Sequence, residues 1–248
     1  MRFSVVVPAY NESASLPFAL ESLRRQDVGA DQFEIIVVDN GSDDDTSAIA
    51  RSYGARVVVE PRRGVCDARQ AGVDASQGEF VVSTDADTTH PQDWLRRIDT
   101  ALRSRPDAVA IGGPCRYADP PWWGLVFPLI GFAGVGLVAR LCGRPSYLTA
   151  TNVAFRRQGF PGYDTRLTQG GDEVDLLRRL VALGPVLWDA GNVVDTSARR
   201  FRLGLLHTLV ISFGYYYGLS TVVNRVAGRR VIGVAPAVRS DPPEARVH

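Results

Sequence analysis

Short β-branched runs alternate with helical patterns through the first half of this chain, and no other feature constrains its fold as strongly. Strands are predicted over residues 3–7, 33–38, 56–59, 80–83 and 108–111, and helices over 16–26, 46–53, 67–76 and 91–104. Continuous apolar strands separated by helices are typical of a mostly parallel sheet covered on both faces. We therefore predict an α/β fold, with a mostly parallel central sheet flanked by helices.

Charge and cysteine content exclude several classes of protein. The net charge of +1 gives no case for a general nucleic-acid binder. The three cysteines, Cys66, Cys115 and Cys142, match no zinc-binding spacing, and their odd number argues against a disulfide framework. The first predicted strand begins at Phe3, so we expect no secretory signal before it. A reducing cytoplasm is the simplest setting.

Three of the predicted strands run into polar, acidic segments. The first is followed by PAYNE (residues 8–12), the second by DNGSDDD (residues 39–45) and the fourth by TDADT (residues 84–88). Ligands bind parallel α/β sheets beyond the carboxyl ends of the strands, where these segments would meet. Carboxylates gathered on one rim repel each other unless a cation compensates. The sequence therefore predicts a site for Mg²⁺ or Mn²⁺, which take one or two carboxylates together with phosphate oxygens.

Four motifs in order resemble family 2 of the glycosyltransferases. They are VVVPAYNE, VVDNGSDDDT, the Asp-x-Asp of STDADT, and GGDEVDLLRRL, and the resemblance covers about residues 1–195. It implies the A-type glycosyltransferase fold with a Rossmann-like nucleotide-binding half. It also implies an inverting enzyme that takes a sugar from a UDP- or GDP-linked donor.

The resemblance implies donor-binding and metal-binding roles for residues at the strand ends. Donor contacts are expected from Pro8, Ala9, Tyr10, Glu12, Asp39, Gly41, Ser42, Arg69, Asp85 and Ala86. Asp39 would accept a hydrogen bond from the base, and Arg69 lies where the family commonly has Ala-Arg-Asn, although this chain has Gln70 in place of that Asn. Asp87, with Asp85, would bind the metal. A simpler interpretation makes the acidic residues turn and helix-cap residues.

The segment Gly170–Leu180 is the candidate for the catalytic base. A carboxylate near the acceptor hydroxyl must take its proton as the new bond forms. The family usually has Glu-Asp here with Asp as the base, whereas this chain has Asp172-Glu173. Register favours Glu173, and Asp172 could serve after a small backbone shift. The alternative is an ordinary acidic first helical turn in which Asp175 pairs with Arg178 or Arg179.

Two further segments are candidates for the acceptor or diphosphate side of the site. Residues 149–157 resemble the family segment that crosses this side, with Asn152 as the contact, although a strand with a polar turn is the alternative. Arg199 and Arg200 could reach the diphosphate from the far wall. His90 and His207 are lone histidines without a partner at metal-ligand spacing, and we interpret both as structural.

Two uncharged runs, residues 120–139 and 203–224, are each long enough to cross a bilayer, which takes about 20 residues. Pro128 and four glycines in the first run favour a broken or re-entrant segment over a straight helix. Arginines flank both ends of the second run, which favours the cytoplasmic surface. We predict helices that lie on the membrane or re-enter it beside the acceptor opening. A buried core and a dimer interface are the alternative.

The predicted organisation is a catalytic domain over 1–198 with an apolar insert at about 117–147, membrane-associating helices over 199–228, and a flexible tail over 229–248. We expect a lipid-linked or cell-envelope acceptor and a location on the cytoplasmic face of the cell membrane, with a homodimer as an alternative to a monomer. A sugar nucleotidyltransferase is disfavoured because no Gly-rich basic loop follows the first strand, and a dinucleotide oxidoreductase because G-x-G-x-x-G is absent. A non-catalytic nucleotide-sugar-binding partner subunit remains an alternative.

Overall fold

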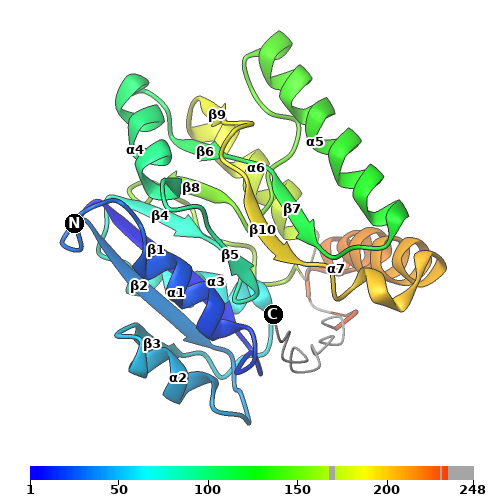
Figure 1. Ribbon diagram of the computed structural model, residues 1–248. Coiled ribbons are helices and arrows are strands. Elements are labelled where there is room, and N and C mark those ends of the chain that lie inside the picture. The colour runs from blue at the N-terminus through cyan, green and yellow to red at the C-terminus, as the bar shows by residue number, and fades with distance from the viewer. Residues whose placement is uncertain (168–170, 230, 234–248) are drawn as a thin grey trace.

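The predicted strands assemble into one seven-stranded sheet in the order β3-β2-β1-β4-β8-β6-β9 in the computed structural model, which describes residues 1–167, 171–229 and 231–233. The strands are β1 (Phe3–Ala9), β2 (Phe33–Asp39), β3 (Arg56–Val59), β4 (Phe80–Ser83), β6 (Ala110–Gly112), β8 (Val153–Arg156) and β9 (Val186–Trp188). β1 pairs in parallel with β2 and β4, and β8 pairs antiparallel with both β4 and β6. The expectation of a mostly parallel sheet is confirmed, with β8 as the exception (Figure 1).

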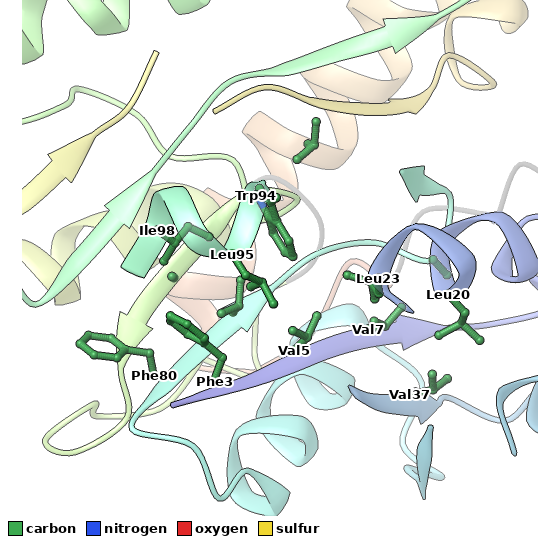
Figure 2. Close-up of a cluster of buried hydrophobic side chains, with 14 of the residues drawn as sticks. Phe3, Val5, Val7, Leu20, Leu23, Val37, Phe80, Trp94, Leu95 and Ile98 are labelled. Atoms are coloured by element: carbon green, nitrogen blue, oxygen red, sulfur yellow. The ribbon is translucent and has the colours of Figure 1, made fainter. Parts of the chain in front are cut away.

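Helices cover both faces of this sheet because successive β1 side chains point to opposite sides. Val5 and Val7 belong to a core with α1 (Leu16–Arg24), α2 (Thr46–Ser52) and α4 (Trp94–Ser104), part of which Figure 2 shows around Phe3, Leu20 and Trp94. Val6 belongs to the core on the other face, under α3 (Val65–Ala75) and α6 (Gly171–Leu183). The two cores place the loops at the carboxyl ends of β1, β2 and β4 on a rigid support.

A small second sheet lies beside the same rim. It has the order β5-β10-β7, formed by β5 (Thr88–Thr89), β10 (Val194–Ser197) and β7 (Cys115–Ala118). β10 pairs antiparallel with β5, which places Thr196 opposite Thr88, and pairs in parallel with β7. Because β5 follows Asp87 directly, this pairing brings the chain after β10 to the acidic end of β4.

The first apolar run forms α5 (Trp122–Cys142), one unbroken helix on the outside of the molecule, whose Phe132 stacks on Trp188 of β9 with ring centroids 6.0 Å apart (Figure 1). The expectation of a broken segment is wrong. Pro128 lies inside the helix. A Cβ added at Gly131 or Gly134 would have no atom within 4 Å, so no neighbouring element forces a break there. An interior proline removes one helical hydrogen bond and crowds the carbonyl four residues earlier, and this long apolar helix tolerates both effects at Pro128.

The second apolar run is helical except at Gly204, whose φ of 94° separates two helical segments. A short 3₁₀ turn, η1 (Phe201–Leu203), precedes the π-helix η2 (His207–Leu219) and α7 (Ser220–Ala227), and Figure 1 shows this segment below the first turns of α5. The side chains of Trp123 in α5 and Phe201 meet edge to face, with ring centroids 5.3 Å apart. Of the predicted tail, residues 230 and 234–248 lie outside the described residues.

Candidate donor and catalytic site

The loops after β1 and β2 are joined by reciprocal hydrogen bonds. The Asn11 N–H donates to Ser42 Oγ at 3.0 Å, and the Asp43 N–H donates to Asn11 Oδ1 at 2.8 Å. Asn11 adopts a positive φ of 54°, a conformation that asparagine tolerates better than most residues. The first two predicted donor segments therefore form one rigid edge. Pro8 and Ala9, the last residues of β1, pair with β2 and contribute backbone to it.

Asp39 ends β2 and holds the turn that follows. Its carboxylate accepts the Ser42 N–H at 2.8 Å and the Ser47 hydroxyl of α2. Burial raises the pKa of Asp39, but the hydrogen bonds from Ser47 and Ser42 outweigh burial, so the pKa is lower than usual. Asp39 is therefore the turn residue of the simpler interpretation, and it stays ionised at the predicted position for a base contact.

Tyr10 forms a cation–π contact with Arg63. The Arg63 guanidinium carbon lies 3.7 Å from the Tyr10 ring centroid. Gly41 lies beneath them with φ of 80°, and a Cβ there would approach Arg63 Nε to 3.4 Å. Glycine is therefore favoured by the backbone conformation, since the added Cβ would make only an ordinary contact with Arg63. This flat cationic and aromatic surface suits a nucleobase or a phosphate, and sequence reasoning did not single out Arg63.

Asp85 joins three elements at the carboxyl end of β4. Its Oδ1 accepts Arg69 Nη2 at 2.9 Å, and its Oδ2 accepts the Thr151 hydroxyl at 2.7 Å. The neighbouring Ala86 is buried. Arg69 therefore binds a carboxylate predicted to contact the donor, rather than standing free to bind a ribose.

Arg69 also binds the predicted base segment. Its Nη1 donates to Asp172 Oδ2 at 2.6 Å, and both side chains are about 95% buried. Burial alone would lower the pKa of Arg69, but the charges of Asp85 and Asp172 raise it, so the guanidinium remains charged. The donor loop and the first turn of α6 are thus held together by one buried arginine.

Glu173 faces the other way, toward the loop that follows α5. Its Oε1 accepts the Ala150 N–H at 2.9 Å, and its Oε2 accepts the Tyr147 hydroxyl. Burial, with the nearby negative charge of Asp172, raises the pKa of Glu173 to about 7. A carboxylate with this pKa can accept a proton near neutral pH. Of the two candidate bases, Asp172 is ion-paired with Arg69, whereas Glu173 is not paired with an arginine in the described part of the chain and has a raised pKa.

Asn152 is placed behind the site. Its Oδ1 accepts Trp94 Nε1 at 2.9 Å, and its Nδ2 donates to the carbonyls of Pro114 at 3.0 Å and Asn192 at 2.6 Å. The residue is 2% exposed. Its amide is used to join α4 and the loops around β7 and β10, so it supports the neighbouring Thr151 rather than presenting a donor to a sugar.

Arg199 reaches the acidic end of β4 from the loop after β10. Its Nη1 donates to Glu12 Oε2 at 2.9 Å, and its Nη2 lies 3.2 Å from Asp87 Oδ2. Burial raises the pKa of Asp87 to about 6, with the charge of Arg199 acting against burial and those of Asp85 and Glu12 adding to it. Arg200 also lowers this pKa through its charge. The predicted diphosphate-side arginines therefore lie beside the predicted metal ligand.

The residues at this rim fit a divalent ion. Glu12, Asp85 and Asp87 all lie near the Arg199 guanidinium and raise its pKa against the effect of burial. Among the described residues, no group of three or more His, Cys, Asp or Glu side chains is arranged to hold a metal by itself. Two carboxylates completed by phosphate oxygens and water are the usual ligand set of Mg²⁺. Asp85 and Asp87 would thus hold the ion together with a bound diphosphate.

The predicted site residues therefore meet at one rim, with the exception of Asn152. Two sets of ion pairs lie across it, Glu12–Arg199–Asp87 and Asp85–Arg69–Asp172, and the Asp85-Ala86-Asp87 segment joins them. No sequence pattern indicated Tyr147, which follows an apolar helix in a loop, or Thr196, whose hydroxyl is 3.4 Å from Asp87.

The doubly covered sheet and its acidic rim are those of an A-type glycosyltransferase fold. Two of the solved structures that match this chain illustrate the similarity. A mannosyltransferase from Pyrobaculum calidifontis in complex with GDP-Man and Mn²⁺ matches with a TM-score of 0.64 and 24% identity, over 79% of this chain and 56% of that one. Glucosyl-3-phosphoglycerate synthase from Mycobacterium tuberculosis, in complex with Mn²⁺, UDP and glucosyl-3-phosphoglycerate, matches with a TM-score of 0.62 and 22% identity, over 91% and 79%.

The chain belongs to glycosyl transferase family 2, whose family model matches residues 4–160. The glycosyltransferase AglE of Haloferax volcanii is 32% identical over 124 residues, which cover 47% of this chain and 40% of that protein. A PGL/p-HBAD biosynthesis glycosyltransferase of Mycobacterium bovis is 32% identical over 135 residues, covering 51% and 52%. These matches span about half the length of each curated relative.

Proposed function

We propose that this protein is an inverting glycosyltransferase that moves a sugar from a UDP- or GDP-linked donor to an acceptor bound beside Glu173. The observation that carries the proposal is that two sets of ion pairs, Glu12–Arg199–Asp87 and Asp85–Arg69–Asp172, meet at the Asp85-Ala86-Asp87 segment, which supports nucleotide, metal and base positions at one rim. Family membership and the nucleotide-bound neighbours support it.

Each part of the rim has a role in this reaction. Asp39, Tyr10 and Arg63 would receive the nucleotide, whose phosphates lie toward the arginine side. A bound Mg²⁺ or Mn²⁺ on Asp85 and Asp87 would supply Lewis-acid stabilisation of the leaving diphosphate. Glu173 takes the proton from the acceptor hydroxyl as that oxygen attacks the anomeric carbon, and Ala150 and Tyr147 fix the carboxylate in position. A single displacement of this kind inverts the anomeric centre.

The acceptor is proposed to be lipid-linked and presented at a membrane surface. α5 is the only helix among the described residues that is long and apolar enough to span a membrane, with a mean hydropathy of 2.0 and 6% of its most apolar window buried. One such helix is weak evidence for a span. Exposure of its side chains favours a surface location: Trp122, Leu129, Ile130, Leu137 and Leu141 are each more than half exposed.

Charge around the apolar helices supports an anionic lipid surface as their partner. Most arginines of the catalytic body pair with carboxylates, as Arg2, Arg97 and Arg116 do. Arg140 and Arg144 at the end of α5 have no carboxylate within 4 Å among the described residues. Unpaired cations next to exposed apolar side chains are the pattern of interfacial helices. This arrangement would place the enzyme on the cytoplasmic face of the cell membrane.

The direct test measures release of the nucleoside diphosphate from UDP- and GDP-sugars in the presence of Mn²⁺, with and without a bacterial lipid extract. We expect release that depends on Mn²⁺ and increases with the extract. Asp87→Ala should abolish it, whereas Asp107→Ala, at an exposed aspartate paired with Arg105, should not. Donor binding without any turnover, in the presence of lipid, would instead identify a non-catalytic binding subunit.

A further inference from the structure

Arg199 is bound to a donor-site carboxylate more firmly than to the metal-site carboxylate. Its two terminal nitrogens donate to the two carboxylate oxygens of Glu12, whereas a single longer contact of 3.2 Å reaches Asp87. The side chain is 19% exposed. Paired and bidentate contacts of guanidinium with carboxylate are the strong ones. The link to Asp87 is therefore the part of this cluster that can be broken at low cost.

The position of Arg199 is fixed by the small sheet. Thr196 of β10 lies opposite Thr88 of β5, and the Thr88 hydroxyl donates to the Thr196 hydroxyl at 3.0 Å. Thr196 in turn lies 3.4 Å from Asp87 Oδ1. Both oxygens of Asp87 are thus occupied, one by Thr196 and one by Arg199. A metal ion that binds Asp87 must compete for these oxygens.

We propose that Arg199 competes with the divalent ion for Asp87 and, once that contact is broken, donates to the diphosphate of the bound nucleotide. The inference rests on the proposed function. Glu12 would retain the guanidinium at the rim, so the N–H group released from Asp87 faces the same space as the metal. The planar guanidinium matches phosphate oxygens well. Arg199 would thus oppose binding of the metal alone and favour binding of metal and nucleotide together.

The proposal predicts two effects of opposite sign from one substitution. Neutralising residue 199 removes a positive charge beside three carboxylates, so the affinity for Mn²⁺ alone should rise, about tenfold. It also removes a donor to the diphosphate, so the affinity for UDP or GDP at saturating Mn²⁺ should fall, about tenfold. A residue that only supports the fold would weaken both.

The experiment is a calorimetric titration of the full-length protein with Mn²⁺ alone, and then with UDP and GDP at saturating Mn²⁺. The variants are Arg199→Gln, which is neutral, and Arg199→Lys, which keeps the charge but not the bidentate geometry. Arg199→Lys should bind Mn²⁺ like the parent protein and bind nucleotide more weakly. The matched control is Arg105→Met, which breaks another bidentate arginine–carboxylate pair, with Asp107, on an exposed surface away from the small sheet. It should change neither affinity.

Unchanged or weakened Mn²⁺ binding by Arg199→Gln, in a protein that melts at the parental temperature, would overturn the inference. Arg199→Met provides the same neutral substitution if Arg199→Gln does not fold. A parent protein that binds neither Mn²⁺ nor any nucleoside diphosphate would contradict the proposed function instead. The two failures are therefore distinguishable.

Discussion

Arg69 Nη1 lies 2.6 Å from Asp172 Oδ2, and this buried ion pair is the contact that joins the donor half of the rim to the catalytic half. Both side chains are almost completely buried, and Arg69 also binds Asp85. Sequence reasoning assigned Arg69 to the nucleotide and Asp172 to the acceptor side. Their direct contact means that neither half of the site can move independently of the other.

Replacing Arg69 should therefore destabilise the protein. Arg69→Met leaves Asp172 buried without its cation, and breaking a buried pair in this way costs about 3–5 kcal/mol. Urea denaturation should show this loss in the free energy of unfolding. The double variant Arg69→Met/Asp172→Asn removes the uncompensated charge and should recover part of the loss. No recovery in the double variant would show that the two residues are not energetically coupled.

The two adjacent acidic residues should separate into different roles on mutation. Glu173→Gln removes the proposed base, so kcat should fall by about 10²–10⁴-fold while the donor dissociation constant stays the same. Asp172→Asn should lower the melting temperature and reduce kcat less, because it mainly removes a partner of Arg69. Steady-state kinetics together with thermal unfolding provide the comparison. The reverse ranking of the two kcat values would assign the base to Asp172.

The rate should depend on pH through Glu173. The ionised form is the active one, and burial raises its pKa to about 7, so kcat/KM should fall about tenfold per unit as the pH drops below that value. The Tyr147 hydroxyl bond lowers this pKa. Tyr147→Phe should therefore shift the acidic limb of the pH–rate profile to higher pH. A limb that stays in place would show that another group controls it.

His90 should make the fold sensitive to acid. The two ring nitrogens of His90 form hydrogen bonds with the hydroxyls of Ser22 (3.0 Å) and Thr84 (2.8 Å). Burial lowers the pKa of His90 from 6.5 to about 3. Below pH 6.5, His90 binds a proton in the unfolded chain but stays neutral in the folded chain. The free energy of unfolding therefore falls as the pH decreases. The slope for one proton is about 1.4 kcal/mol per pH unit. Urea unfolding at several pH values measures it.

The control for this measurement is His90→Gln, which cannot titrate in that range. Its free energy of unfolding should be lower than that of the parent protein at neutral pH, but with a flatter dependence on pH between about 4 and about 6.5. An equal slope in both proteins would contradict the prediction and would place the acid sensitivity elsewhere in the chain.

Vesicle binding should depend on the exposed side of α5. In a flotation assay, the protein should float with vesicles that contain phosphatidylglycerol and much less with phosphatidylcholine alone. Leu129→Glu/Ile130→Glu, at residues 73% and 67% exposed, should abolish flotation. Val59→Glu provides the control, since Val59 is 63% exposed but lies on β3. A dimer that forms without lipid and ignores both vesicle types would instead indicate that α5 packs against a second copy.

The strands and their acidic ends were predictable because each depends on a local pattern. Val5, Val6 and Val7 form a continuous apolar run that only a doubly covered strand can bury, and PAYNE follows it directly. The contacts made by the polar side chains of the site could not be predicted from local sequence patterns. Arg69 and Asp172 are 103 residues apart, and Asn152 meets Trp94 across the core, so only the fold shows that their polar groups are already paired.

Local sequence patterns also could not predict that the first apolar run forms one continuous helix. Proline and glycine lower helix propensity, but the outcome depends on whether a neighbouring element would gain from a break. Around Gly131 and Gly134, α5 has no such neighbour, and the helix remains continuous there. Tyr147 could not be identified for a related reason: its contact with Glu173 depends on where the chain returns after α5.

The central strand of the small sheet, β10, begins 34 residues beyond the end of the segment that the family model matches. A protein shortened to that segment would lose the partner of both β5 and β7, and with it the arginine that holds Glu12 and Asp87. It would also expose the edge of β6 where β9 now pairs. The segment shared with the family therefore lacks strands that complete both sheets. For expression, grafting or comparison between relatives, a fragment of this chain should extend at least through Arg199.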